Sequence, residues 1–289
     1  MTGSANCQTA LVHGRRTAMR QAGGLALACH LPPTLAVTAV LTAFAAAAGR
    51  GAGTVCVGAA VLAGQLSVGW CNDYVDRDRD RRSGRTDKPV VRGTVAAPVV
   101  GAAAVIALAA CVPLSLASGW RAALAHLAGV AAAWAYDLGL KATPLSPVPY
   151  AVGFGLLPAF VVLGLPGHPA PPAWLVAAGV TLGVGAHFAN VLPDLRADRQ
   201  TGIVGLPHRI SATGSRATAG LLLVAASALL AAGPGRLDAV GVAGLAVVAV
   251  LLAAGVVVTR RPGSRAAFSV VLVVALLDAA MLIARGHGI

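Results

Sequence analysis

Nine apolar runs, most of them about 20 residues long, constrain this chain more than any other feature. A helix of that length crosses a bilayer, and its backbone hydrogen bonds are satisfied without water. The mean hydropathy of +0.78 and the 11% share of charged residues also lie outside the range of soluble domains. The runs cover residues 25–48, 54–74, 96–116, 119–138, 147–165, 173–192, 216–233, 237–258 and 266–284. The sequence therefore predicts an all-α, polytopic membrane protein of about nine transmembrane helices.

The chain divides into a short polar segment and one membrane domain. Residues 1–24 carry Arg15, Arg16 and Arg20, and the run that follows is too long for a signal-peptide core and has no convincing cleavage site. We interpret residues 1–24 as a cytoplasmic N-terminal segment and residues 25–289 as a single transmembrane domain.

Basic residues set the expected orientation. With the N-terminus inside, all but four of the 22 lysines and arginines fall on cytoplasmic segments; the four are Arg50, Arg121, Arg236 and Arg285. The formal net charge of +12 is spread over short juxtamembrane loops, where anionic lipid explains it, and no nucleic-acid module is visible. We expect a multi-pass protein of the cell membrane, with membrane lipid and not nucleic acid as its surroundings.

The five cysteines indicate buried thiols and no disulfide framework. They lack CxxC spacing, and most lie in or beside apolar runs; they are Cys7, Cys29, Cys56, Cys71 and Cys111.

The acids are placed unusually. The chain has ten acidic residues, all aspartate, and the predicted topology puts eight of them on the cytoplasmic side: Asp73, Asp76, Asp78, Asp80, Asp87, Asp137, Asp194 and Asp198. Carboxylates near the negative face of a membrane do not serve topology. A bound cation is a natural reason for such clustering.

Two aspartate segments superpose at an offset of 118 residues. The shared pattern is N-x3-D-x3-D-R-x-[ST]-G, and it begins at Asn72 in the first copy and at Asn190 in the second. Because the offset spans four predicted helices, both copies lie on the same side of the membrane. We therefore expect two parallel repeats, with the helices around a central cavity and the site between the repeats, open to the cytoplasm.

On a continuous helix each motif forms a stripe of oxygen ligands. Residues four apart share a face, so Asp73, Asp76 and Asp80 would face the site while Asp78 points away. Asn190, Asp194 and Asp198 would form the second stripe, within which Pro193 is expected to kink or end the helix and to splay the aspartates toward the cavity. Carboxylates of this kind suit Mg²⁺, which also takes phosphate oxygens, so we expect a diphosphate substrate. The alternative, a solvated loop of self-neutralising charges, is disfavoured by the second copy.

At these residues the sequence resembles the UbiA superfamily of intramembrane prenyltransferases. Members carry NDxxDxxxD after the second helix and DxxxD after the sixth, which here are Asn72-Asp73…Asp76…Asp80 and Asp194…Asp198. Further similar stretches are Asp87-Lys88-Pro89 and Tyr136…Lys141.

The resemblance implies an enzyme that moves a prenyl group from a prenyl diphosphate to a lipophilic acceptor, often an aromatic or quinone-type ring. It implies Mg²⁺ bound by the aspartates Asp73, Asp76, Asp80, Asp194 and Asp198. Diphosphate contacts are expected from Asn72, Asn190, Lys88, Arg92, Tyr136, Lys141 and Arg209. Topology alone would also explain basic residues in these loops. Ala142 and Gly205 depart from the basic residue and the threonine or serine that many members carry.

Other polar and aromatic residues are ambiguous. The aromatics near the predicted inner helix ends could protect a carbocation or form an interfacial belt; they are Trp70, Tyr74, Trp134, Tyr136, Tyr150, Phe154 and Phe188. For His187 and Asp278 we favour hydrogen bonds between helices.

Three other functions remain to be weighed. A membrane terpene cyclase would use the same motifs without an acceptor. A transporter would bind its substrate at broken helices near the midplane, whereas these acids lie at the cytoplasmic rim. The CDP-alcohol phosphotransferases are disfavoured because their DGxxAR element is missing.

Overall fold

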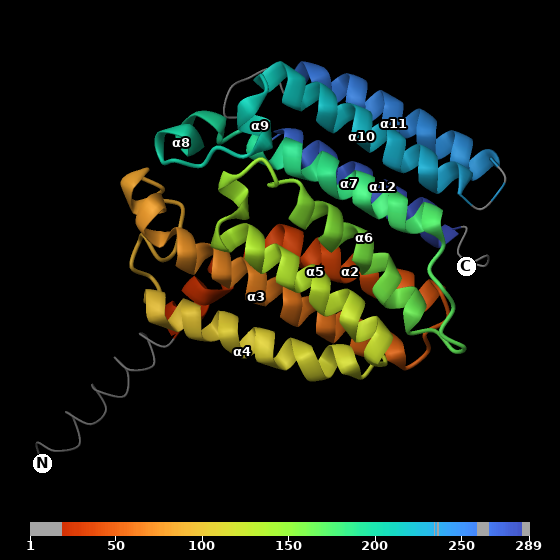
Figure 1. The fold of residues 1–289 in the computed structure, drawn as a ribbon, viewed down its shortest axis with the longest axis horizontal. Coiled ribbons are helices and arrows are strands. Elements are labelled where there is room, and N and C mark those ends of the chain that lie inside the picture. Colours follow the sequence, from red (N-terminus) through yellow and green to blue (C-terminus); the bar gives the residue numbers. More distant parts are fainter. Residues whose placement is uncertain (1–18, 234, 236, 259–265, 285–289) are drawn as a thin grey trace, which may run out of the picture.

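The computed structural model describes residues 19–233, 235, 237–258 and 266–284, and within these residues it contains helices and turns but no strand. A first helix, Met19–Ala28, precedes the labelled elements of Figure 1. The long helices are α2 (Leu31–Ala47), α3 (Gly53–Arg82), α4 (Ala97–Leu116), α5 (Trp120–Leu138), α6 (Val148–Leu163), α7 (Ala173–Val191), α10 (Ala212–Ala232), α11 (Ala239–Val258) and α12 (Ala266–Ala284). The short ones are η1 (Leu140–Ala142), α8 (Leu195–Gln200) and α9 (Leu206–Arg209). The all-α class is confirmed.

Several helices suit a membrane by length and composition. Four of the described helices, α3, α4, α7 and α10, are long and apolar enough to cross a bilayer. Met19–Ala28 and α2 together would make a fifth span, and three apolar helices are shorter. A multi-pass membrane protein fits these helices, while the count of nine spans and the two parallel repeats stay predictions.

The first predicted helix, residues 25–48, is wrong as a continuous element. Met19–Ala28 and α2 meet at an angle of 67°. His30 adopts a left-handed backbone conformation with φ of 56°, and Pro32 and Pro33 open α2, where proline is tolerated because the first turn lacks hydrogen-bond partners. The bend turns the first helix out of line with α2 and leaves His30 at the junction, beside Asp73.

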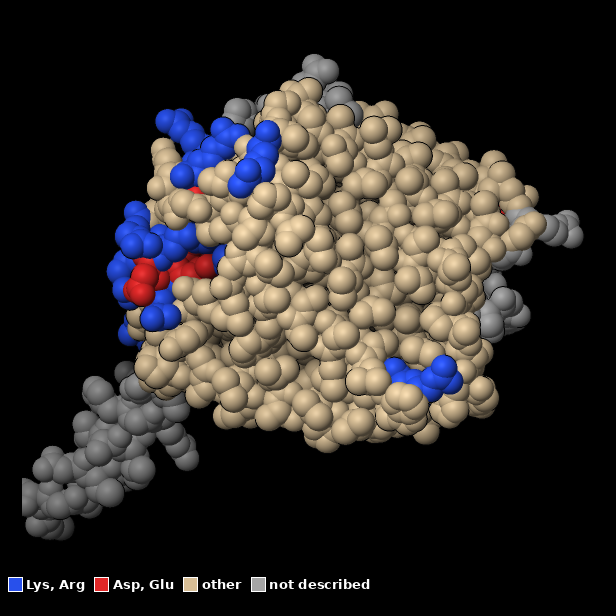
Figure 2. Space-filling model, viewed as in Figure 1, with Lys and Arg blue, Asp and Glu red and all other residues tan. Residues whose placement is uncertain are grey.

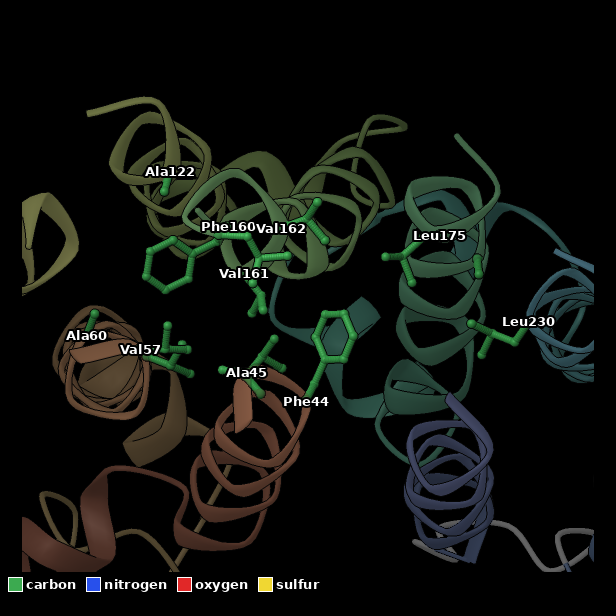
Figure 3. Packing of buried hydrophobic residues seen from close by; sticks show 14 of the residues in the cluster. Phe44, Ala45, Val57, Ala60, Ala122, Phe160, Val161, Val162, Leu175 and Leu230 are labelled. Atoms are coloured by element: carbon green, nitrogen blue, oxygen red, sulfur yellow. The ribbon is translucent and has the colours of Figure 1, made fainter. Parts of the chain in front are cut away.

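Small side chains let the helices pack closely, as is usual where lipid supplies no hydrophobic drive between helices. The largest buried cluster joins α2, α3, α5, α6, α7, α10 and α12, with Phe44 and Phe160 as its largest members (Figure 3). The last helix, α12, packs against α2 and α7, so the end of the chain returns to its beginning. The four described cysteines are free thiols, as predicted.

We predict that Gly69→Ala lowers the thermal stability of the protein. A Cβ at Gly69 would lie 2.5 Å from the carbonyl oxygen of Cys29, a backbone atom that cannot rotate away. Overpacking of this kind typically costs about 1–3 kcal/mol. The melting temperature in detergent measures the effect. Gly220→Ala on α10 is the matched control, since a Cβ there meets nothing within 4 Å; equal stability of the two variants would contradict the close contact.

Candidate active site

The charged side chains gather at one end of the bundle. Figure 2 shows acidic side chains surrounded by lysine and arginine at this end, beside a broad face that carries a small basic patch at its far end and is otherwise uncharged in this view. Because α3 continues to Arg82, the whole first motif is helical, as predicted. Asp73, Asp76 and Asp80 are 2–5% exposed, whereas the Asp78 side chain is 59% exposed and pairs with Arg81. The predicted placement of the four aspartates on opposite faces of one helix is confirmed.

Asp76 is the most heavily bonded of these acids. Its Oδ1 accepts a hydrogen bond from Lys141 Nζ at 2.6 Å. Its Oδ2 accepts from Arg79 Nη2 at 2.6 Å and from Asn72 Nδ2 at 3.2 Å. Asn72 also donates to Asp137 Oδ1 at 2.9 Å, which ties the end of α5 to α3. Asp76 therefore lies at the centre of a network that joins two helices and the turn after α5.

Asp73 is held by the first helix pair and by the loop after α3. Lys88 Nζ lies 2.5 Å from Asp73 Oδ1, and His30 Nε2 lies 3.2 Å from the same oxygen. His30 and Lys88 are themselves 3.0 Å apart. Asp73 Oδ2 is buried and has no hydrogen-bond partner among the described residues. One oxygen of Asp73 thus remains available inside the site.

The second motif does not form one continuous helical stripe, so that prediction is wrong, whereas the helix end expected at Pro193 is observed. The helix α7 ends at Val191, and α8 starts at Leu195. Pro193 lies in the break, because proline has no N–H to donate and its ring clashes with the preceding turn. Asn190 bonds to the Tyr150 hydroxyl at 3.2 Å, away from the other two polar residues of the motif. Asp194 is the N-cap residue of α8, and Asp198 lies in the first turn of that helix. A turn separates both residues from α7.

Arg79 joins the two motifs, and Arg85 pairs with the second motif. Arg79 Nη1 lies 4.0 Å from Asp198 Oδ1, and Arg85 Nη1 lies 3.7 Å from Asp194 Oδ2. The hydrogen bonds between Arg85 and Asp87, together with nearby carboxylates, raise the pKa of the Arg85 side chain above its usual value, so it stays cationic. Within the described residues, no three acidic, histidine or cysteine side chains are arranged to hold a metal ion together. Four of the motif carboxylates, those of Asp73, Asp76, Asp194 and Asp198, are instead paired with basic side chains.

The predicted basic residues divide into two groups. Lys88 and Lys141 contact the acids, while Arg92 bonds to the Thr86 carbonyl oxygen and Arg209 is exposed. Neither arginine contacts an acid among the described residues. Tyr136 lies on the last turn of α5, five residues before Lys141 of the η1 turn.

The glycine that departs from the family pattern has a packing reason. A Cβ at Gly205 would lie 2.6 Å from Ser146 Oγ and 2.7 Å from the Lys141 carbonyl oxygen. The loop after the second motif therefore closes tightly on the turn that holds Lys141. A threonine or serine at this position would require that turn to shift.

Four of the predicted aromatic residues cluster around His187, and the other three lie apart from this cluster. Tyr136, Tyr150 and Phe154 lie together with His187, and the ring centroids of Tyr150 and His187 are 4.9 Å apart. Phe188 contacts the His187 ring. Trp70, Tyr74 and Trp134 lie elsewhere: Trp70 donates to the Leu25 carbonyl, Trp134 donates to Ser67, and Tyr74 is exposed beside Arg77.

His187 and Asp278 differ in their bonding. His187 Nε2 lies 3.0 Å from Ser146 Oγ, so it connects α7 to the loop before α6, in line with the hydrogen bond expected. Asp278 is buried on α12 and interacts with the Ser227 side chain of α10, in line with the contact between helices that was expected.

Sequence reasoning missed several residues at this end of the bundle. His30 was hidden inside an apolar run, although the following Pro32 and Pro33 signal a helix start. Arg79 stands three residues after Asp76, a spacing that brings side chains together on a helix. The others are Arg85, Asp137 and His208, the last of which lies 3.3 Å from Asp198 Oδ2.

Comparison with known proteins identifies the family. A model of the UbiA prenyltransferase family matches residues 22–277. This chain belongs to the UbiA prenyltransferase family. The match covers most of the chain and includes both aspartate motifs. Its membership identifies the chain, at the level of the family, as a prenyltransferase.

Solved UbiA structures share the fold at low sequence identity. A UbiA homologue from Aeropyrum pernix K1 is 22% identical, with a TM-score of 0.69 over 86% of this chain and 97% of that one. A homologue from Archaeoglobus fulgidus, solved with GPP and Mg²⁺, is 17% identical, with a TM-score of 0.65 over 91% and 98%. A digeranylgeranylglyceryl phosphate synthase is 14% identical, with a TM-score of 0.67 over 92% and 98%. No curated protein sequence matches the chain.

Proposed function

We propose that this UbiA protein is a magnesium-dependent prenyltransferase that joins the prenyl group of a prenyl diphosphate to a lipophilic acceptor of aromatic or quinone type. The main support is the buried face of α3, where Asp73, Asp76 and Asp80 lie with Lys88 and Lys141 within 2.6 Å of two of them. The UbiA homologue solved with GPP and Mg²⁺ has the same fold. We also propose that this end of the bundle faces the cytoplasm, as the basic loops predict.

The residues present fit a magnesium ion. Asp73 Oδ2 is buried without a partner, and Asp80, which is 4% exposed, interacts with the nearby cations among the described residues only through their charge. These are hard oxygen donors of the kind that Mg²⁺ prefers. Magnesium commonly takes only one or two carboxylates and completes its shell with phosphate oxygens and water, so a preformed set of three protein ligands is not required. We propose that bound Mg²⁺ draws its one or two carboxylate ligands from Asp73, Asp76, Asp80, Asp194 and Asp198.

The cations of the site have a separate task. When the allylic C–O bond breaks, the electron pair leaves with the diphosphate, and bound magnesium stabilises the charge that develops there. Lys88 and Lys141 already lie among the carboxylates, and their ammonium groups can share this charge at the phosphate oxygens. Asn72 can hold the leaving group through its amide. Arg92 and Arg209 are exposed, so we leave them outside the proposed first contacts.

The aromatic group next to the acids supports a carbocation site. Tyr136 and Tyr150 present their rings between α5 and α6, with centroids 5.2 Å apart. The faces of such rings attract a cation, and their apolar surroundings keep water away. The acceptor carbon would attack the allylic carbon and release a proton.

The position of the helix breaks favours an enzyme over a transporter. The helices are interrupted before α2 and between α7 and α8. The first break brings His30 to Asp73, and the second brings Asp194 to Arg85, both at the charged end of the bundle. Transporter sites are instead expected at broken helices near the midplane. A UbiA-type terpene cyclase remains the second candidate, because its motifs are the same.

We predict that a suitable acceptor accelerates diphosphate release and that a joined product appears. The purified protein in detergent is incubated with Mg²⁺ and prenyl diphosphates of several lengths, with and without aromatic acceptors. Released diphosphate and products are measured together. Transfer requires the acceptor to capture the carbocation, whereas a cyclase quenches the cation within its own chain.

The same experiment separates the two candidates. A hydrocarbon or terpene alcohol formed at the full rate without any acceptor would establish the cyclase and reject the transferase. Protein with Asp76→Asn provides the background rate of spontaneous hydrolysis.

A further inference from the structure

Arg79 is the one described cation that reaches carboxylates of both motifs. Its Nη2 lies 2.6 Å from Asp76 Oδ2, and its Nη1 lies 4.0 Å from Asp198 Oδ1. Lys141, by comparison, pairs with Asp76, and Lys88 pairs with Asp73. The planar guanidinium group can face two carboxylates at once because its nitrogen atoms form a fork. Arg79 therefore occupies the space between the two acid groups.

The bonds at Asp76 show what Arg79 blocks. Asp76 Oδ2 already accepts from Arg79 and Asn72, while Oδ1 accepts only from Lys141. A carboxylate oxygen has about two lone-pair positions, so Oδ2 has none left for another ligand while Arg79 is in place.

Arg79 is also the partner of Asp76 that can move. Lys141 is buried in the short η1 turn, and the amide of Asn72 is fixed by a second bond to Asp137. The Arg79 side chain is 21% exposed and stands three residues along α3 from Asp76. Its long side chain can therefore turn without any change in the backbone.

We propose that Arg79 is an exchangeable counter-ion of the site. Without a ligand it neutralises Asp76 and Asp198; when a diphosphate binds with magnesium, it turns to the phosphate oxygens and frees Asp76 Oδ2. Guanidinium groups bind phosphate and carboxylate with the same forked geometry, which makes this exchange favourable. The inference rests on the proposed function, since it takes diphosphate as the ligand. It follows that Arg79 weakens the binding of a metal ion when no diphosphate is present and strengthens the binding of diphosphate when the metal is present.

Two binding measurements on Arg79→Gln test this exchange. Mn²⁺ alone, followed by electron paramagnetic resonance, is expected to bind more tightly by roughly fivefold, because a competing positive charge is gone. Inorganic diphosphate in saturating Mg²⁺, followed by calorimetry, is expected to bind about tenfold more weakly, because a charged forked contact is lost. The opposite signs of the two changes are the signature of the exchange.

Two variants control for simpler effects. Arg81→Gln removes a neighbouring arginine that is 61% exposed and pairs with Asp78, and both affinities are expected to stay within about twofold of the unmodified protein. Arg79→Lys keeps the charge but loses the fork, so Mn²⁺ affinity should return towards normal while diphosphate binding stays weak.

The outcomes separate the inference from the proposed function. If Arg79→Gln weakens both ligands, or behaves like Arg81→Gln, the exchange is rejected while the metal site stands. If the unmodified protein binds no diphosphate even with Mg²⁺, the proposed function fails and the inference with it.

Discussion

Replacing Asp76 with asparagine is expected to lower turnover by at least about 100-fold, because a central ligand charge is lost. Asparagine keeps the size of the side chain, and its carbonyl oxygen can still accept a hydrogen bond from Lys141. The folded protein should therefore remain in the membrane. Turnover is measured as diphosphate release, and folding is checked by the melting temperature and by gel filtration in detergent.

Asp78→Asn is the matched control for this change. Asp78 lies on the same helix, two residues away, but its side chain is 59% exposed and pairs with Arg81. Turnover of this variant should stay within about twofold of the unmodified protein, since exposed ion pairs contribute little. Equal damage at Asp76 and Asp78 would show that the buried face of α3 does not hold the ligands. If Asp76→Asn lowered the amount of protein inserted in the membrane but left the turnover per inserted molecule unchanged, Asp76 would serve topology and not catalysis.

Removal of divalent cations is expected to abolish both turnover and binding of the prenyl diphosphate. Without metal, the phosphate charge would meet the buried carboxylates of Asp73, Asp76 and Asp80, and the cations Lys88, Lys141 and Arg79 are already paired with two of these carboxylates. Exhaustive chelation followed by a binding assay with a labelled prenyl diphosphate measures the effect.

Adding metals back tests the chemistry of the site. Mg²⁺ or Mn²⁺ should restore turnover, whereas Ca²⁺, which takes longer bonds and more ligands, should restore less. Activity that survives chelation would reject the metal model. Binding that survives while turnover is lost would limit the metal to the chemical step.

Sequence alone predicts most of the helical architecture. The apolar runs locate α3 to α7 and α10 to α12 because the bilayer demands long uninterrupted helices. The break before α2 was missed because hydropathy does not detect backbone direction: His30 and its neighbours read as part of one run, and only the prolines that follow mark a new start.

Only the part of the site that lies on one continuous helix could be predicted from the sequence. The buried face of α3 follows from a four-residue repeat in a continuous helix. The same spacing failed in the second motif, where Pro193 ends the helix and the acids are positioned by a turn. Contacts such as that of His30 with Asp73, and that of Arg79 with Asp198, join segments distant in the chain. No local pattern contains them.

The bend before α2 also decides how the protein can be engineered for purification. The second half of Met19–Ala28 is anchored by the Trp70 bond to Leu25 and by the packing of Gly24 against Val95, and this helix leads directly into His30, which contacts Asp73 and Lys88. A truncation that removed this helix, or a bulky fusion partner joined directly to it, would disturb the mouth of the site. The deep-blue end of α12 lies at the opposite end of the bundle (Figure 1), so an affinity tag beyond that end leaves the acids untouched.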